Sequence, residues 1–314
     1  MSIKILIRNW KLKDDLKEHE RIGRRNFLRI SGLLELLMSS TPVYAVDSNP
    51  KLRFGIVTDS HYADIDTKMG RYYRQSLAKM EECVNLMKRQ QVDFLIELGD
   101  LKDQDDEPSE ELTISYLRAI ESIFQNGAER TYHVLGNHDV DSISKSQFLS
   151  VTTNTGIPSQ GTFYTYCLGG LQFMVLDANY RADGEEYDHG NFDWVDTNIP
   201  TSQLDWLRQK LHASPFPSVV FVHQLLDGEG SHYINNAVEV RQILEDSGKV
   251  LAVFQGHQHD GQYNLINGIH YYTLPAVVEG AGQKNNAYAI VEIHRDNSIS
   301  VVGYHKAFSR VFCQ

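Results

Sequence analysis

Five short clusters of Asp, Asn and His are the chemically most informative feature of this sequence. They are Asp59-x-His61, Gly99-Asp100, Gly136-Asn137-His138-Asp139, His223 and Gly256-His257-x-His259. Each cluster follows an apolar run that is typical of a buried strand, and three contain a glycine that lets the backbone turn sharply. Ligand sites of α/β folds lie just past the carboxyl ends of strands. The pattern therefore predicts that the five clusters form one site.

The side chains in these clusters are those of a metal site. Carboxylates, an amide oxygen and imidazoles without thiolates suit Mn²⁺, Fe²⁺ or Zn²⁺ better than Ca²⁺, which prefers oxygen ligands alone. The candidate ligands are Asp59, His61, Asp100, Asn137, His223, His257 and His259. This number is enough for two metal ions if one carboxylate bridges them. Two-metal sites activate water and neutralise phosphate oxygens, so we predict phosphoryl chemistry without a Ser or Cys nucleophile.

The elements that must position these clusters can be predicted from hydrophobic periodicity. Apolar runs predict strands at 52–58, 93–98 and 132–135, with helices at 70–90 and 109–126 between them. This alternation favours a largely parallel first sheet. Further along the chain, Gly169-Gly170 and Asn267-Gly268 are typical of two-residue hairpin turns. We expect an α/β domain in which helices cover two stacked mixed sheets.

The five clusters in this order (DxH, GD, GNHD, H, GHxH) resemble the calcineurin-like metallophosphoesterase superfamily, over nearly all of the chain from residue 52. The resemblance implies a four-layer α/β-β/α sandwich in a metallophosphoesterase domain at 46–314. It implies one metal held by Asp59, His61 and His259, and another by Asn137, His223 and His257, with Asp100 bridging. It also implies that His138 lies beside the phosphate, where it stabilises the transition state or protonates the leaving oxygen, and that Asp103 orients His138.

A closer resemblance, to manganese-dependent ADP-ribose/CDP-alcohol diphosphatases, rests on four segments. These segments are Tyr62–Asp66, Arg71–Ser76, Gly256–Tyr263 and Phe308–Cys313. The chain departs from that group at His61, where those enzymes carry Gln, and at Asp139, where they carry Glu. The resemblance implies Mn²⁺ as the metal, with Fe²⁺ and Zn²⁺ as alternatives, and Arg71 and Arg74 as candidate substrate contacts.

We expect a hydrolase that cleaves a phosphodiester, or the diphosphate bond of a small nucleotide conjugate, by attack of a metal-bound hydroxide. The alternatives are a phosphomonoesterase that uses the same metals and, from a different class, a metal-binding scaffold without turnover. Residues 1–45 hold nine Lys/Arg and five Asp/Glu, or +4, so the remainder of the −11 chain carries −15. Such an acidic surface argues against a nucleic acid polymer as partner. We expect a small phosphorylated substrate and no membrane span.

The N-terminal segment has the layout of an export signal. Arg24-Arg25-Asn26-Phe27-Leu28-Arg29 is followed by an apolar run at 30–38 and by Val43-Tyr44-Ala45. A basic patch, an apolar core and small residues at a cleavage site are typical of such signals. The double arginine resembles the twin-arginine type. We therefore expect export of the domain to the periplasm or beyond; the alternative is an N-terminal extension on a cytoplasmic protein.

Overall fold

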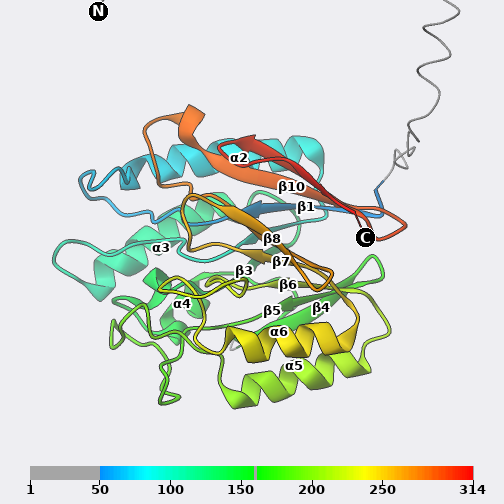
Figure 1. Cartoon of the computed structure of the whole chain (residues 1–314). Helices are drawn as coiled ribbons and strands as arrows, with labels where there is room; N and C mark the ends of the chain where they lie inside the picture. Colours follow the sequence, from blue (N-terminus) through cyan, green and yellow to red (C-terminus); the bar gives the residue numbers. More distant parts are fainter. Residues whose placement is uncertain (1–49, 159–160, 314) are drawn as a thin grey trace, which may run out of the picture. The chain divides into compact units, whose positions relative to one another are not determined.

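The fold described here is that of a computed structural model, which describes residues 50–158 and 161–313. The predicted export signal at 1–45 lies outside these residues. Two six-stranded sheets and the helices that flank them make up the described part of the chain (Figure 1). Within that part, no helix is both long and apolar enough to cross a membrane.

The first sheet has the order β12-β11-β10-β1-β2-β3. Its strands are β1 (Leu52–Val57), β2 (Phe94–Glu97), β3 (Thr131–His133), β10 (Ala287–Ile293), β11 (Ile299–His305) and β12 (Arg310–Phe312). Strands β1, β2 and β3 are parallel, as predicted, but β10 to β12 pair antiparallel. The prediction of a largely parallel sheet is therefore wrong for its C-terminal half. There the strands follow one another through short turns without crossover helices, and such connections give antiparallel pairing.

The second sheet has the order β4-β5-β6-β7-β9-β8. Its strands are β4 (Tyr164–Leu168), β5 (Leu171–Val175), β6 (Ser218–Phe221), β7 (Val250–Gln255), β8 (Gln262–Ile266) and β9 (Ile269–Thr273). Both predicted hairpins are confirmed, because Leu168 pairs with Leu171 and Ile266 pairs with Ile269. Gly169 and Gly170 have φ of 58° and 69°, the left-handed values that a type I′ hairpin turn requires.

Helices cover the outer faces of both sheets. The helices are α2 (Ser76–Gln90), α3 (Glu110–Phe124), α4 (Lys145–Val151), α5 (Thr201–Ala213) and α6 (Ala237–Ser247), with 3-10 turns η1 (Tyr73–Gln75), η2 (His138–Val140) and η3 (Gln283–Asn285). Apolar residues of α2, α3 and α4 pack in one core with the outward face of the first sheet. Those of α5 and α6 pack in another core with the second sheet (Figure 1). This layering confirms the predicted α/β-β/α sandwich.

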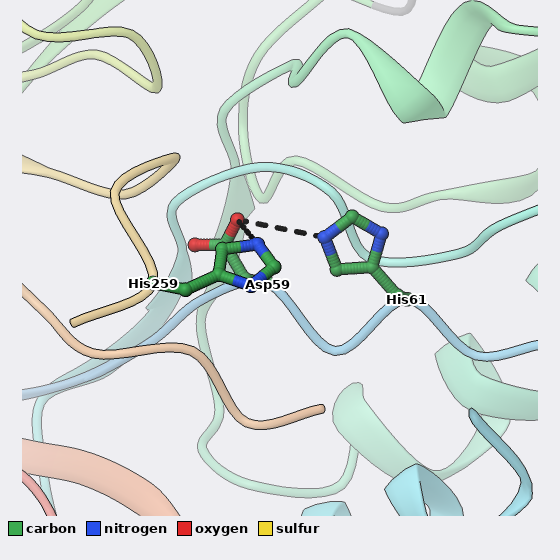
Figure 2. Close-up of side chains that lie close together, drawn as sticks. All are labelled: Asp59, His61 and His259. Carbon is green, nitrogen blue, oxygen red and sulfur yellow. Dashed lines mark ion pairs between the residues drawn. The ribbon is translucent and has the colours of Figure 1, made fainter. Parts of the chain in front are cut away.

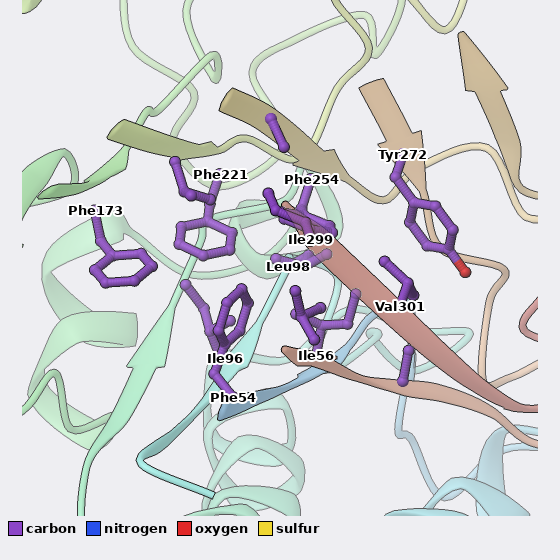
Figure 3. Packing of buried hydrophobic residues seen from close by; sticks show 14 of the residues in the cluster. Phe54, Ile56, Ile96, Leu98, Phe173, Phe221, Phe254, Tyr272, Ile299 and Val301 are labelled. Carbon is purple, nitrogen blue, oxygen red and sulfur yellow. The ribbon is translucent and has the colours of Figure 1, made fainter. Parts of the chain in front are cut away.

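A third core joins the two sheets face to face, and Phe54 lies at its centre (Figure 3). The ring of Phe54 stacks on Phe94 at 4.6 Å between centroids. It also makes edge contacts at 5.8–5.9 Å with Phe173, Phe221 and Phe254 of the second sheet. Aromatic contacts of this kind add to the free energy of simple apolar burial. They fix how the strand ends of one sheet face those of the other.

Candidate metal centre

The candidate ligands lie just beyond the strand ends of both sheets. Asp59 and Asp100 follow β1 and β2 of the first sheet, whereas His223 and His257 follow β6 and β7 of the second. The backbone of Asp59, His61, Asp100 and His257 is left-handed, with φ of 52°, 44°, 58° and 65°. Asp and His adopt this region more readily than most residues. The sharp turns bring side chains from four strand ends into one site.

Asp59, His61 and His259 form the first cluster (Figure 2). Oδ1 of Asp59 lies 3.6 Å from Nε2 of His61 and 3.4 Å from Nε2 of His259. Oδ2 of Asp59 accepts hydrogen bonds from the Thr58 hydroxyl at 2.7 Å and the His257 amide at 3.0 Å. These bonds fix the carboxylate so that Oδ1 faces both imidazoles, as a shared metal ion would require.

Asp100, His223 and His257 form the second cluster, which is buried. Oδ2 of Asp100 lies 3.1 Å from Nε2 of His223 and 3.5 Å from Nε2 of His61, a member of the first cluster. The other His223 nitrogen, Nδ1, donates to the Leu98 carbonyl at 2.8 Å, so Nε2 is the nitrogen that faces the site. Asp100 thus contacts both clusters, as a carboxylate shared by two metal ions would.

Four buried polar atoms of the predicted ligands have no hydrogen-bond partner within the described residues. They are Oδ1 of Asp59, Nε2 of His61, Oδ1 of Asn137 and Nε2 of His257. Buried polar atoms without a partner are rare and call for an explanation. All four belong to the predicted ligands, and carboxylate, amide oxygen and imidazole are suitable donors for divalent transition metals. The residues therefore fit two metal ions.

Asp103 lies between His138 and His61 of the first cluster. Its Oδ1 lies 3.3 Å from Nδ1 of His138, and its Oδ2 lies 3.1 Å from Nδ1 of His61. Burial alone disfavours the charged form of His138, but the carboxylates of Asp103 and Asp100 raise the pKa of His138 well above its usual range. Because Nδ1 is engaged by Asp103, Nε2 is the His138 nitrogen available to a substrate.

Asp139 connects the loop after β2, which carries Asp100, to the loop after β3, which carries Asn137. Its carboxylate accepts hydrogen bonds from the backbone amides of Asp100, Leu101 and Gly136 at 2.9–3.0 Å. Burial, together with the charge of Asp100, raises the pKa of Asp139 to about 6. The residue after His138 thus fixes the loop that carries Asp100 against the loop that carries Asn137.

Glu279 is a site residue that the sequence analysis missed. Its Oε1 lies 2.7 Å from Nδ1 of His259, so Nε2 of that histidine is directed at Asp59. The Val278 amide, one residue earlier, donates to the Asp59 carbonyl at 3.0 Å, which brings this segment to the site. No short motif links Glu279 to His259, 20 residues away. Only the fold reveals the contact.

The two arginines proposed as substrate contacts have different surroundings. Nε of Arg71 lies 3.6 Å from Oε1 of Glu279, so Arg71 borders the first cluster. Arg74 pairs instead with the exposed carboxylates of Asp64 and Asp66. Its guanidinium is occupied by these surface groups. We therefore keep Arg71 alone as a candidate substrate contact.

A hollow of about 350 Å³ opens beside His138 and Asn137. Its other lining residues are Gln104, Asp141, Phe192, Asp193 and Trp194. The exposed indole of Trp194 lies 5.7 Å from the His257 ring and 5.3 Å from the His232 ring, between centroids. The sequence analysis did not single out this tryptophan, because a loop residue without a motif carries no local signal.

Comparison with known proteins gives concordant matches. The model of the calcineurin-like phosphoesterase family matches residues 52–261. The manganese-dependent ADP-ribose/CDP-alcohol diphosphatase of Xenopus laevis is 24% identical to this chain. The match covers 80% of this chain and 87% of the Xenopus protein. A 3′,5′-cyclic-nucleotide phosphodiesterase of Nostoc sp. is also 24% identical, and the match covers 77% of this chain and 85% of the Nostoc protein. A dimetal phosphatase of Danio rerio superposes with a TM-score of 0.72 at 21% identity, covering 84% of this chain and 99% of that structure.

Proposed function

Because this chain belongs to the calcineurin-like phosphoesterase family of metal-dependent hydrolases, we propose a specific substrate class for it: small nucleotide conjugates. The bond cleaved is the diphosphate bond of an ADP-ribose or CDP-alcohol type of molecule. The observation that carries the proposal is the pair of ligand clusters, with the His138 ring 4.6 Å from the His61 ring of the first cluster, between centroids. The similarity to ADP-ribose/CDP-alcohol diphosphatases, which extends over 80% of the chain, supports the substrate class.

We propose that Asp59, His61 and His259 hold one metal ion and that Asn137, His223 and His257 hold the other, with Asp100 between them. When bound, two such ions activate water and neutralise the oxygens of a phosphate. Mn²⁺ is the ion we propose, because the donor set suits it and the relative from Xenopus laevis is manganese-dependent.

The chain's own groups supply the remaining steps. His138 is held by Asp103 with Nε2 free, and this nitrogen donates a proton to the oxygen that leaves phosphorus. Asp103 stabilises the imidazolium form that makes this donation possible. Arg71 borders the first cluster and offers its guanidinium to the second phosphate of the substrate.

A second candidate substrate is a 3′,5′-cyclic nucleotide, which the similarity to the Nostoc phosphodiesterase favours. The same metal ligands and the same histidine serve either reaction. The two candidates differ in what the site must accommodate, since a conjugate carries a second phosphate and a second organic group.

The test is product release by purified protein with added Mn²⁺, with and without EDTA. The substrates are ADP-ribose, CDP-choline, cyclic AMP, bis-p-nitrophenyl phosphate and p-nitrophenyl phosphate. We expect EDTA-sensitive cleavage with the highest kcat/KM for the two diphosphates. A preference for cyclic AMP would select the second candidate, and a preference for the monoester would reject both. Absence of turnover on every substrate would favour a metal-binding scaffold.

A further inference from the structure

The hollow beside His138 combines a flat aromatic surface with a hydrogen-bond acceptor that lacks a partner. Trp194 is exposed along it. Oε1 of Gln104 is buried and has no hydrogen-bond partner within the described residues, whereas Oδ2 of Asp141 lies 3.7 Å from Nδ1 of His138. Asp193 also lines this hollow. A ligand of this hollow must therefore offer a face to the indole and donate hydrogen bonds.

The loop that carries Trp194 is held in place before any ligand arrives. The Gly190 amide donates to the Val140 carbonyl at 3.1 Å, which ties the loop to the turn that carries His138. Buried Tyr187 stacks on Phe192 at 3.8 Å between ring centroids and donates its hydroxyl to the Asp196 carbonyl at 2.7 Å. The indole thus has a fixed position next to the metal centre, and fixed positions lower the entropic cost of binding.

We propose that this hollow binds the base of the substrate and selects bases that carry an exocyclic amino group. Adenine and cytosine each present such an amino group, whereas uracil presents a carbonyl oxygen at the corresponding place. In this assignment Trp194 stacks on the base and Gln104 accepts a hydrogen bond from its amino group. A uracil carbonyl would face the acceptor oxygen of Gln104, leaving both oxygens without a donor. The inference rests on the proposed function and specifies its substrate further.

Binding of reaction products tests the assignment without turnover. The sequence has three tryptophans: Trp10, Trp194 and Trp206. In a Trp206→Phe background with Mn²⁺ present, we expect CMP and AMP to quench the fluorescence of Trp194. UMP should bind at least about tenfold more weakly, because sites built to hydrogen-bond a group reject an analogue that lacks it. Ribose 5-phosphate and phosphocholine should cause no quenching. Quenching by phosphocholine but not by CMP would show that the hollow takes the alcohol half, and would overturn the inference.

Two variants separate stacking from amino-group selection. Trp194→Ala should raise KM for CDP-choline about tenfold or more while kcat changes little, since loss of a base–aromatic stack weakens binding. Gln104→Met keeps the size of the side chain but removes the acceptor, so it should bring CMP and UMP to similar affinities. Trp206→Phe, which removes a tryptophan from α5, is the matched control and should leave KM unchanged.

The failure of this inference is distinguishable from failure of the proposed function. If the wild-type protein cleaves CDP-choline and Trp194→Ala has the same KM, the base site is wrong and the substrate class stands. If the wild-type protein cleaves no conjugate, the substrate class is wrong. In that event a CMP affinity, measured by calorimetry, that falls at least about tenfold in Trp194→Ala would still support the base site, and equal affinities in the two proteins would reject it.

Discussion

His138 is the residue whose removal best separates chemistry from metal binding. We expect His138→Ala to lower kcat on CDP-choline by about 10²- to 10⁴-fold, the usual contribution of a general acid or base. Bound manganese, measured by elemental analysis, should stay near the wild-type level, because none of the seven predicted ligands is changed. His212→Ala, at an exposed position of α5, is the matched control. An unchanged kcat in His138→Ala would rule out a catalytic role.

Glu279 gives a residue-scale prediction for metal affinity. Partners of metal-binding histidines typically contribute 10- to 100-fold in affinity or activity. We therefore expect Glu279→Ala to weaken Mn²⁺ binding by that factor in calorimetric titrations of metal-free protein. Glu292→Ala removes a carboxylate that pairs with Arg53, on the first sheet, and should leave the affinity unchanged. Equal affinities in the two variants would contradict the role of Glu279 in orienting His259.

At the scale of elements, Lys79 connects α2 to the segment that carries Glu279. Its buried ammonium donates to the carbonyls of Val277 at 2.5 Å and Gly280 at 2.8 Å. Burial, with a contribution from nearby Lys306, lowers the pKa of Lys79 to about 8, against 10.5 for an ordinary lysine. Between these two values the unfolded chain binds more protons than the folded chain, so this residue's contribution to the free energy of unfolding rises with pH.

The prediction is tested by comparing wild-type protein with Lys79→Met in urea unfolding between pH 7 and 10.5. Methionine cannot titrate, so the difference in free energy of unfolding isolates the lysine. Above about pH 8, the free energy of unfolding of the wild type should rise relative to that of Lys79→Met, by at most a few kcal/mol. A difference independent of pH would mean that the ammonium is not disfavoured in the folded protein.

Strands and motifs also differ in how far the sequence alone could predict them. The site residues in the five clusters were found because each cluster is short and follows its own strand, so the signal is local. The antiparallel pairing of β10 with β1 was not found, because these two strands are far apart in the sequence and no local signal shows that they are neighbours. Trp194 and Glu279 were missed for a related reason. Each lies at the site through contacts that the folded protein makes with residues elsewhere in the chain.

At the scale of the whole molecule, the two sheets must keep their relative position for the two halves of the metal centre to meet. Phe54 contacts aromatic rings of both sheets. Phe54→Ala should therefore lower the free energy of unfolding by about 3–5 kcal/mol, as Phe→Ala changes in cores do. It should also weaken Mn²⁺ binding, because the sheets repack around the cavity.

Phe124→Ala is the matched control for this prediction. Phe124 is equally buried, but it packs between α3 and the outer face of the first sheet. We expect a similar loss of stability with metal affinity close to wild type. If both variants bound Mn²⁺ with wild-type affinity, the packing between the sheets would not control the metal centre.

The left-handed backbone at Asp59, His61, Asp100 and His257 has a consequence for how this sequence could evolve. Such conformations cost non-glycine residues roughly 1–2 kcal/mol each, whereas glycine adopts them freely. A library varied at these four positions and sorted only for thermal stability should thus become enriched in glycine and lose activity. The same library sorted for activity should return the present residues. Selection for a more durable fold and selection for turnover would then lead this chain to different sequences.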